Sequence, residues 1–260
     1  MQTLVSMKNV SVIRSGKRII DDLTWDVHLG ERWVVIGPNG AGKSTLLSLL
    51  SSYLFPSAGE LEVLGRAFGR SDITDLKTRV GMTSASLMAL IPEDEKVEDI
   101  VLSSAYAVFG RWQEEYDPWD ESRSSALLAA LGVKHLRGRP FITLSEGEKK
   151  RVMIARALMP DPEILLMDEP AAGLDLGGRE DLLQRIAGFS MDPQSPVTIT
   201  VTHHLEEIPK GSTHLLVLKQ GRLFAQGEIQ ETLTSAMLSD LYGQDLQLGV
   251  NQGRFFARSL

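Results

Sequence analysis

The stretch WVVIGPNGAGKSTLLSLL, residues 33–50, decides the fold of this chain. It opens with a short apolar run that contains β-branched side chains, which predicts a buried strand. It closes with leucines at helical spacing, which predict a helix that has ended before Pro56. The glycine-rich loop between them fits the pattern G-x-x-x-x-G-K-[ST], in the strand–loop–helix context that the pattern requires. The stretch therefore predicts a loop that binds phosphate.

The residues of this loop suit the phosphates of a nucleotide. The glycines let backbone N–H groups approach phosphate oxygens with no Cβ in the way, and the helix that opens at Gly42 directs its positive dipole end at the same charge. Lys43 would neutralise β- and γ-phosphate oxygens, and the Ser44 hydroxyl would bind Mg²⁺. The alternative is a glycine-rich turn with an exposed lysine. The candidate binding residues are Gly37, Pro38, Asn39, Gly40, Ala41, Gly42, Lys43, Ser44 and Thr45.

A second apolar run, residues 164–167, ends in the acid pair Asp168 and Glu169. At the tip of a buried strand, Asp168 would support the coordination shell of Mg²⁺ in an enzyme with a phosphate-binding loop. Glu169 would orient a water molecule and act as its general base. Taken alone, the pair is equally well explained as a solvated strand end; the loop upstream favours the catalytic interpretation.

Three further motifs follow a similar logic. The segment LSEGE, residues 144–148, holds a capping box of Ser145 and Glu148, and a capped helix start with Gly147 beside it is also an anion site. The loop AGLD, residues 172–175, follows the acid pair and ends in Asp175. His203 follows a β-branched strand and could donate a hydrogen bond to a γ-phosphate. Taken alone, the segment 144–148 is most simply the start of a capped helix. His203 and His204, taken alone, are surface residues or ligands of a metal.

The rest of the chain alternates strand and helix patterns. Strands are predicted over residues 2–13, 19–29, 197–202 and 215–218, and helices over 122–131 and 179–189. This alternation predicts an α/β fold with a parallel sheet. We expect one domain, 1–260, made of a core over 1–74 and 158–260 and a helical subdomain over 75–157.

Composition narrows the function. The chain has 260 residues, with 27 Lys and Arg against 34 Asp and Glu, so its formal charge is −7 and no nucleic-acid partner is expected. There is no cysteine, so no disulfide or thiolate metal site is possible. The start does not read as a secretory signal, and no apolar run approaches the roughly 18 residues of a membrane-spanning helix. At a membrane, another chain would have to cross the bilayer.

Together, the motifs and their order resemble the ATP-binding cassette (ABC) ATPase family over almost the whole chain. The resemblance implies a P-loop NTPase core with a small antiparallel β subdomain and an inserted helical subdomain. It also implies ATP and Mg²⁺ as cofactors, held between two head-to-tail copies. In that template Glu169, His203 and Lys43 serve catalysis, and Ser44 and Asp168 serve the metal. Ser145 and Gly147 close the partner's site, and Asp175 links the two sites.

The chain departs from the family pattern in three motifs, at four positions. Glu146 and Glu148 stand where the signature usually has glycine and glutamine. Arg14 aligns with the aromatic residue that stacks on adenine. Ala85 aligns with a glutamine that normally reaches the metal and the attacking water, a contact that is lost or passed to a neighbouring serine. The likeness is to ATPases of molybdenum-type import and of siderophore and vitamin B12 import, through residues 202–207 and 238–243.

Two functions remain open from the sequence. The first is the energy-coupling subunit of a membrane importer of metal oxyanions or metal chelates. It would lie at the cytoplasmic face of the membrane, bound to a multi-span permease. The alternative is a soluble ABC ATPase in cluster assembly, repair or regulation. Repair is disfavoured because the segment between Thr45 and Leu144 is too short for a long coiled coil and lacks sustained heptads.

Overall fold

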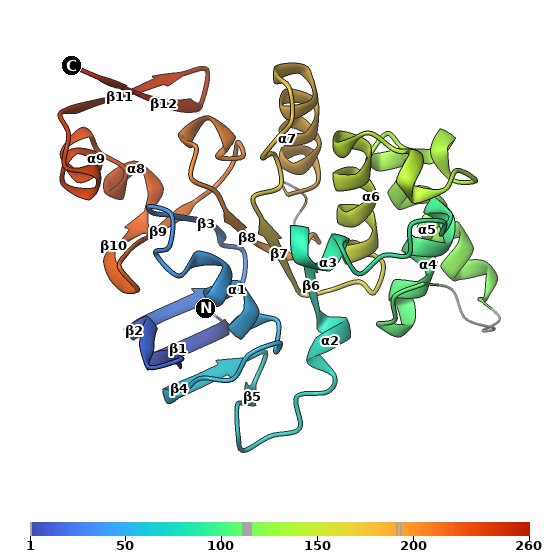
Figure 1. The fold of residues 1–260 in the computed structure, drawn as a ribbon, viewed down its shortest axis with the longest axis horizontal. Helices are drawn as coiled ribbons and strands as arrows, with labels where there is room; N and C mark the ends of the chain where they lie inside the picture. The colour runs from blue at the N-terminus through green and yellow to red at the C-terminus, as the bar shows by residue number, and fades with distance from the viewer. Residues whose placement is uncertain (1, 111–115, 191, 193) are drawn as a thin grey trace. The chain divides into compact units, whose positions relative to one another are not determined.

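The computed structural model describes residues 2–110, 116–190, 192 and 194–260. The chain divides into two compact units, the first formed by Met1–Leu76 with Val197–Leu260 and the second by Lys77–Pro196. Figure 1 shows the elements of both units along the chain. The second unit contains the predicted helical subdomain, 75–157, almost entirely, and it also contains a strand and a helix beyond residue 158. The finer boundary at 75–157 stays a prediction.

An antiparallel sheet forms one part of the first unit. Its strand order is β2 (Lys17–His28), β1 (Thr3–Arg14), β4 (Ala58–Val63) and β5 (Arg66–Ala67). Ser15 and Gly16 link β1 to β2, and both have positive φ, 48° and 77°. A two-residue hairpin of this kind matches the twist of the strands that flank it. The antiparallel subdomain is thus present, with the turn where the sequence predicts it.

Parallel strands form the other part of the first unit. β3 (Arg32–Ile36) pairs in parallel with β8 (Val197–Val201) on one side and β9 (His214–Lys219) on the other. β10 (Arg222–Glu228) adds an antiparallel strand to β9. Every residue of β8 is buried, as expected for a strand covered on both faces. The helix α1 (Lys43–Leu50) follows β3 and buries four leucines.

The C-terminal segment completes the first unit. After the short helical turn η4 (Leu205–Glu207) and strands β9 and β10, the helices α8 (Ile229–Thr232) and α9 (Ser235–Tyr242) precede a hairpin of β11 (Leu246–Asn251) and β12 (Arg254–Ser259). Apolar side chains of the hairpin pack against the cluster that includes Ile208, Leu238 and Leu241. The sequence patterns did not predict this hairpin.

The second unit combines two parallel strands with several helices. β6 (Val80–Thr83) pairs with β7 (Ile164–Asp168) in parallel register, and β6 is a strand that the sequence patterns missed. The core packs α4 (Val97–Ser103), α5 (Pro118–Ala130) and α6 (Glu146–Leu158) against one another. The remaining elements are α2 (Leu76–Arg79), α3 (Ala85–Met88), η1 (Ser104–Tyr106), η2 (Lys134–Leu136), η3 (Phe141–Thr143) and α7 (Leu176–Ser190).

Candidate nucleotide site

The loop from residue 37 to 45 has a backbone that only glycine fits. Gly37, Gly40 and Gly42 have φ of 153°, 78° and 99°. A Cβ on Gly37 would lie 2.1 Å from the Leu218 carbonyl oxygen, and one on Gly42 would lie 2.8 Å from the Ile19 carbonyl oxygen. Both distances are far below van der Waals contact, so the glycines are required by backbone approach as well as by the turn. The loop therefore curls tightly between β3 and α1.

Lys43 is folded over this loop. Its side chain is buried, and its ammonium donates hydrogen bonds to the carbonyl oxygens of Gly37 (2.8 Å) and Pro38 (3.1 Å). Ser44 next to it is exposed. Within the described residues no side chain caps the first turn of α1, whose leading N–H groups have no intrahelical acceptor. A buried ammonium, these N–H groups and the positive end of the helix together fit a bound phosphate.

Thr202 and His203 lie at the same sheet edge as the loop. The Thr202 N–H donates to the Val35 carbonyl oxygen (3.2 Å), which joins the end of β8 to the end of β3. The Thr202 hydroxyl donates to the Glu207 carboxylate (2.7 Å), and both residues are buried. His203 is half-buried with its ring 4.0 Å from that of His204. The Thr202–Glu207 bond thus fixes the loop that carries His203.

A metal site is the alternative explanation for the adjacent residues His203 and His204. Across the described ranges, no group of three or more His, Cys, Asp or Glu side chains gathers in a way that could hold a metal ion by itself.

Arg14, aligned with the adenine-stacking position, is exposed at the end of β1 opposite Lys17.

In the second unit, the acid pair lies at the carboxyl end of β7. Asp168 and Glu169 are half-buried, and Glu169 has φ of 49°. This left-handed conformation costs a non-glycine residue about 1 kcal/mol or more and persists only where neighbouring groups hold it. The register of β6 on β7 pairs Thr83 with Met167, so Ser84 follows at the same edge as Asp168.

Ser84 has a structural role at this edge. Its buried hydroxyl accepts a hydrogen bond from the Leu87 N–H (3.2 Å) and lies 2.9 Å from the Ser86 hydroxyl, so it caps α3. Ala85 is exposed. Of the two hydroxyls that could replace the missing glutamine at Ala85, those of Ser84 and Ser86, the first is therefore hydrogen-bonded within its own helix.

The segment 144–148 forms the predicted capping box at the start of α6. The Ser145 N–H (2.8 Å) and hydroxyl (2.9 Å) both donate to the Glu148 carboxylate, and the Ser145 hydroxyl accepts from the Glu148 N–H (3.4 Å). The hydrogen bond from the Ser145 N–H is the largest cause that lowers the pKa of Glu148. Glu146 pairs with Lys149 (3.1 Å). A Cβ on Gly147 would meet Leu174 at an ordinary 3.6 Å, so contacts within the described chain do not demand glycine there.

Asp175 caps the next helix. Its carboxylate accepts a hydrogen bond from the Gly178 N–H (2.7 Å) in the first turn of α7, and the residue is exposed. Further along α7, Asp181 accepts ion pairs from Arg185 and from Arg151 of α6 (2.6 Å for Arg151). These two partners, Arg185 first, hold the pKa of Asp181 below its usual range. The helix of the signature segment is thereby tied to the helix of Asp175.

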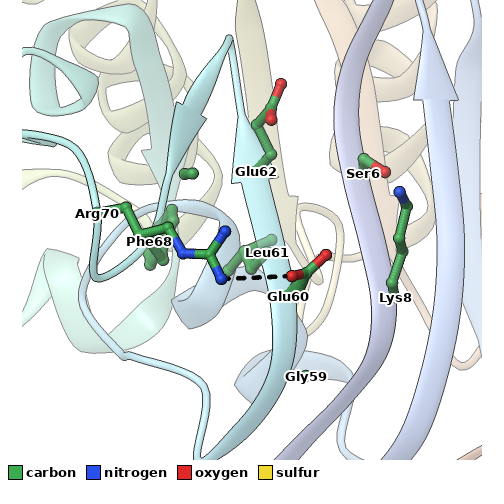
Figure 2. A pocket seen from close by; sticks show the side chains of 9 residues that line it. Ser6, Lys8, Gly59, Glu60, Leu61, Glu62, Phe68 and Arg70 are labelled. Carbon is green, nitrogen blue, oxygen red and sulfur yellow. Dashed lines mark ion pairs between the residues drawn. The ribbon is translucent and has the colours of Figure 1, made fainter.

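A separate pocket of about 160 Å³ lies on the antiparallel sheet, lined by charged side chains of both signs. Figure 2 shows Glu60 and Arg70 facing each other across it, 3.6 Å apart, with Lys8 on the neighbouring strand. None of the motif residues lines this pocket. It is best described as a solvated sheet face whose charges compensate one another.

Comparisons with known proteins agree with the motifs. A family profile described as "ABC transporter" matches residues 20–172. The uncharacterized ABC transporter ATP-binding protein YlmA of Bacillus subtilis (strain 168) is 42% identical over 97% of this chain and 96% of its own. The hemin import ATP-binding protein HmuV of Thermobifida fusca (strain YX) is 34% identical over 94% of this chain and 84% of its own.

Among solved structures, cbiO1 from Clostridium perfringens, part of the ABC transporter complex cbiONQ, is 26% identical with a TM-score of 0.74. The match covers 89% of this chain and 90% of that one. The chain belongs to the ABC transporter family. Within that family it is the ATP-binding subunit, an ATP-hydrolysing enzyme, and the expected α/β cassette fold is confirmed. In the part of the chain that the structure describes, no helix is long and apolar enough to cross a bilayer.

Proposed function

We propose that this chain energises a membrane importer of metal oxyanions or metal chelates by hydrolysing Mg·ATP between two head-to-tail copies. The observation that carries the catalytic part is the loop 37–45, where a buried ammonium and uncapped helical N–H groups converge on one place. Import of a metal compound is supported by the relative named for hemin import, which aligns with most of this chain.

The residues divide the work of hydrolysis. Lys43 and the N–H groups of the loop bind the β- and γ-phosphates, and Glu169 accepts a proton from the water that attacks the γ-phosphorus. His203 donates a hydrogen bond to the γ-phosphate. The hydroxyl of Ser44 and the carboxylate of Asp168 are oxygen ligands of the kind that Mg²⁺ prefers. A Mg²⁺ ion held by these two residues would supply positive charge to the phosphate oxygens.

A second copy completes each site in this proposal. Ser145 and Asp175 are exposed, and Gly147 is half-buried in the first turn of α6. Among the described residues, both exposed side chains make their hydrogen bonds to the first turns of their own helices, and both lie at the surface where the second copy would meet them. The partner that crosses the membrane would be a multi-span permease, with this chain peripheral to the cytoplasmic face.

Replacing the general base tests the catalytic part. Glu169→Gln should bind Mg·ATP yet hydrolyse it about 100-fold more slowly, because an amide cannot accept the proton of the water. Size-exclusion chromatography with Mg·ATP should show the variant accumulating as a dimer. Glu121→Gln, an exposed glutamate of α5, is the matched control and should behave as the wild-type protein. A Glu169→Gln variant that stays monomeric and hydrolyses ATP normally would exclude both the base and the shared site.

The membrane partner needs its own experiment. The tagged full-length chain should co-purify with a multi-span protein from detergent-solubilised membranes of its host. The complex, reconstituted in vesicles, should take up hemin, a metal chelate or molybdate only with ATP on the side of this chain. If only water-soluble partners are recovered and the vesicles show no uptake, the soluble ATPase is the better proposal.

A further inference from the structure

Lys150 contacts the backbone of the turn that follows the acid pair. It lies on α6, about one helical turn after the Ser145 cap, and its side chain is half-buried. Its ammonium donates hydrogen bonds to the carbonyl oxygens of Glu169 (3.2 Å) and Ala172. Lysine offers three donors around one charge, and hydrogen bonds from a charged donor are stronger than neutral ones. One side chain therefore holds two carbonyl groups that are three residues apart.

These two carbonyls mark the ends of one turn. The Ala172 N–H donates to the Glu169 carbonyl oxygen (3.2 Å), which closes the turn 169–172. Glu169 itself has the left-handed backbone that non-glycine residues seldom adopt. The direction of its side chain depends on that backbone conformation, because φ at Glu169 sets where the Cα–Cβ bond points. A group that holds the carbonyl of Glu169 thus also restrains the Cα–Cβ direction from which its carboxylate extends.

The turn also leads to the loop of Asp175. Gly173, with φ of 75°, follows Ala172 directly, and Asp175 then caps α7. Lys150 therefore connects three features of the second unit: the helix that starts at Ser145, the residue proposed as the base, and the loop that carries Asp175. The helix start at Ser145 and the loop of Asp175 are proposed to meet the second copy, and Glu169 is proposed to act on the nucleotide of its own chain.

We propose that Lys150 is a positioning residue for ATP hydrolysis, which holds the Glu169–Ala172 turn so that the Glu169 carboxylate is aimed at the attacking water. The inference rests on the proposed role of Glu169. Lys150 touches no nucleotide in this proposal and acts through the backbone of the turn. Its loss should therefore slow the chemical step while leaving ATP binding at the loop 37–45 intact.

The neighbouring residue shows what a purely structural role looks like. Arg151 ties α6 to α7 through its ion pair with Asp181, and this pair touches neither Glu169 nor Ala172. The hydrogen bonds from Lys150 to the carbonyls of Glu169 and Ala172 are different in kind, because both carbonyls belong to the turn that carries the proposed base. A test must therefore separate a change in kcat from a change in folding or in nucleotide affinity.

The test measures steady-state ATP hydrolysis by the full-length chain with Lys150→Met, Lys150→Arg and the exposed-lysine control Lys134→Met. Lys150→Met keeps the length of the side chain but removes its donors. Its kcat should fall about tenfold or more, with KM for ATP within about twofold of wild type. Lys150→Arg should restore kcat to within about threefold of wild type, because it keeps a charged donor. Lys134→Met should match the wild-type protein.

A double-mutant cycle distinguishes a positioning role of Lys150 from a purely structural one. In the Glu169→Gln background, Lys150→Met should cost less than about twofold more in kcat, because a positioning residue has nothing left to position. Losses that multiply, a wild-type kcat in Lys150→Met, or a parallel loss of ATP binding would each overturn the inference. The proposed nucleotide site has a separate test, because it is excluded if Lys43→Ala hydrolyses ATP normally. If only the Lys150 variants keep a wild-type kcat, the role of Lys150 alone is excluded.

Discussion

Two helices that begin at motif residues, α1 and α6, start in opposite ways. Gly42 opens α1 with a left-handed backbone, and no side chain among the described residues caps its first turn. Ser145 opens α6 with a complete capping box, whose Glu148 carboxylate accepts two hydrogen bonds from Ser145. One helix start therefore leaves its N–H groups for a ligand, while the other satisfies its own.

This difference separates the two halves of the proposed ATP site. At the open start of α1 the glycines already hold the backbone conformation of the loop, and the Lys43 ammonium would exchange the carbonyl oxygens of Gly37 and Pro38 for those of the proposed phosphate. At α6, the Ser145 hydroxyl donates to Glu148, and a capping box stabilises a helix by about 1 kcal/mol. The signature of one copy would have to redirect this hydroxyl to reach the partner's nucleotide. We therefore expect the first half to dominate ATP binding and the second to tune closure.

The largest effect on ATP hydrolysis should come from disrupting the open start of α1. Lys43→Ala removes the buried ammonium that is proposed to bind the phosphates, so hydrolysis should fall by about 100-fold or more. The measurement is steady-state release of phosphate, together with equilibrium binding of ATP. Lys17→Ala, an exposed lysine in the hairpin of β1 and β2, is the control. Hydrolysis near the wild-type rate in Lys43→Ala would show that the loop 37–45 is not the phosphate site.

Disrupting the capped start of α6 should lower ATP hydrolysis less, and it should act on the nucleotide site of the partner copy. Ser145→Arg fills the space at the start of α6, so the homodimer should lose most hydrolysis while each chain still binds ATP. Mixed in equal amounts with Lys43→Ala, it should regain roughly a quarter of the wild-type rate, because half the dimers would carry one intact site. Ser122→Arg, at an exposed serine of α5, should not lower the rate. Mixtures that stay inactive under dimer-forming conditions would argue against shared sites.

The difference between the two starts also explains how far the sequence could predict the structure. The loop 37–45 is encoded locally: three glycines, a lysine and the flanking strand and helix suffice, and each is found where predicted. The capping box is local too. The strand β6 was missed because four residues, VGMT, with a central glycine, carry too little pattern.

The contacts that organise the second unit are less visible in the sequence. Lys150 reaches the carbonyls of Glu169 and Ala172 across 19 and 22 residues. Backbone carbonyls belong to every residue type, so no side-chain pattern marks them. The replacement of the missing glutamine by a neighbouring serine stays a prediction, and only the position of α3 shows that one of these serines, Ser84, also caps a helix. Sequence patterns locate motifs, whereas the groups that hold them depend on pairing between distant segments.

The smallest expected effect comes from removing the charge of Glu148 at the capped start of α6. Glu148→Gln keeps the capping box, because glutamine at the third helical position also accepts from the cap residue, but it removes a carboxylate from the surface proposed to meet the partner's γ-phosphate. We expect ATP-driven dimerisation of the Glu169→Gln protein to become about two- to fivefold tighter with this change, since like charges at close range repel. Glu148→Ala is the matched variant that loses both cap and charge, and it should lower stability by about 1 kcal/mol.

The pH dependence distinguishes charge from capping. Folding lowers the pKa of Glu148 below the ordinary value of 4.5, with the Ser145 N–H as the largest cause. A depressed carboxyl pKa contributes stability that is fully present above the ordinary value and is lost as pH falls through the pKa of the folded state. Urea unfolding of the wild-type protein should therefore lose this contribution in acid, whereas Glu148→Gln should lack that part of the pH dependence. If Glu148→Gln matches the wild-type protein in both dimerisation and acid sensitivity, the carboxylate has no electrostatic role, and the start of α6 differs from that of α1 in its cap alone.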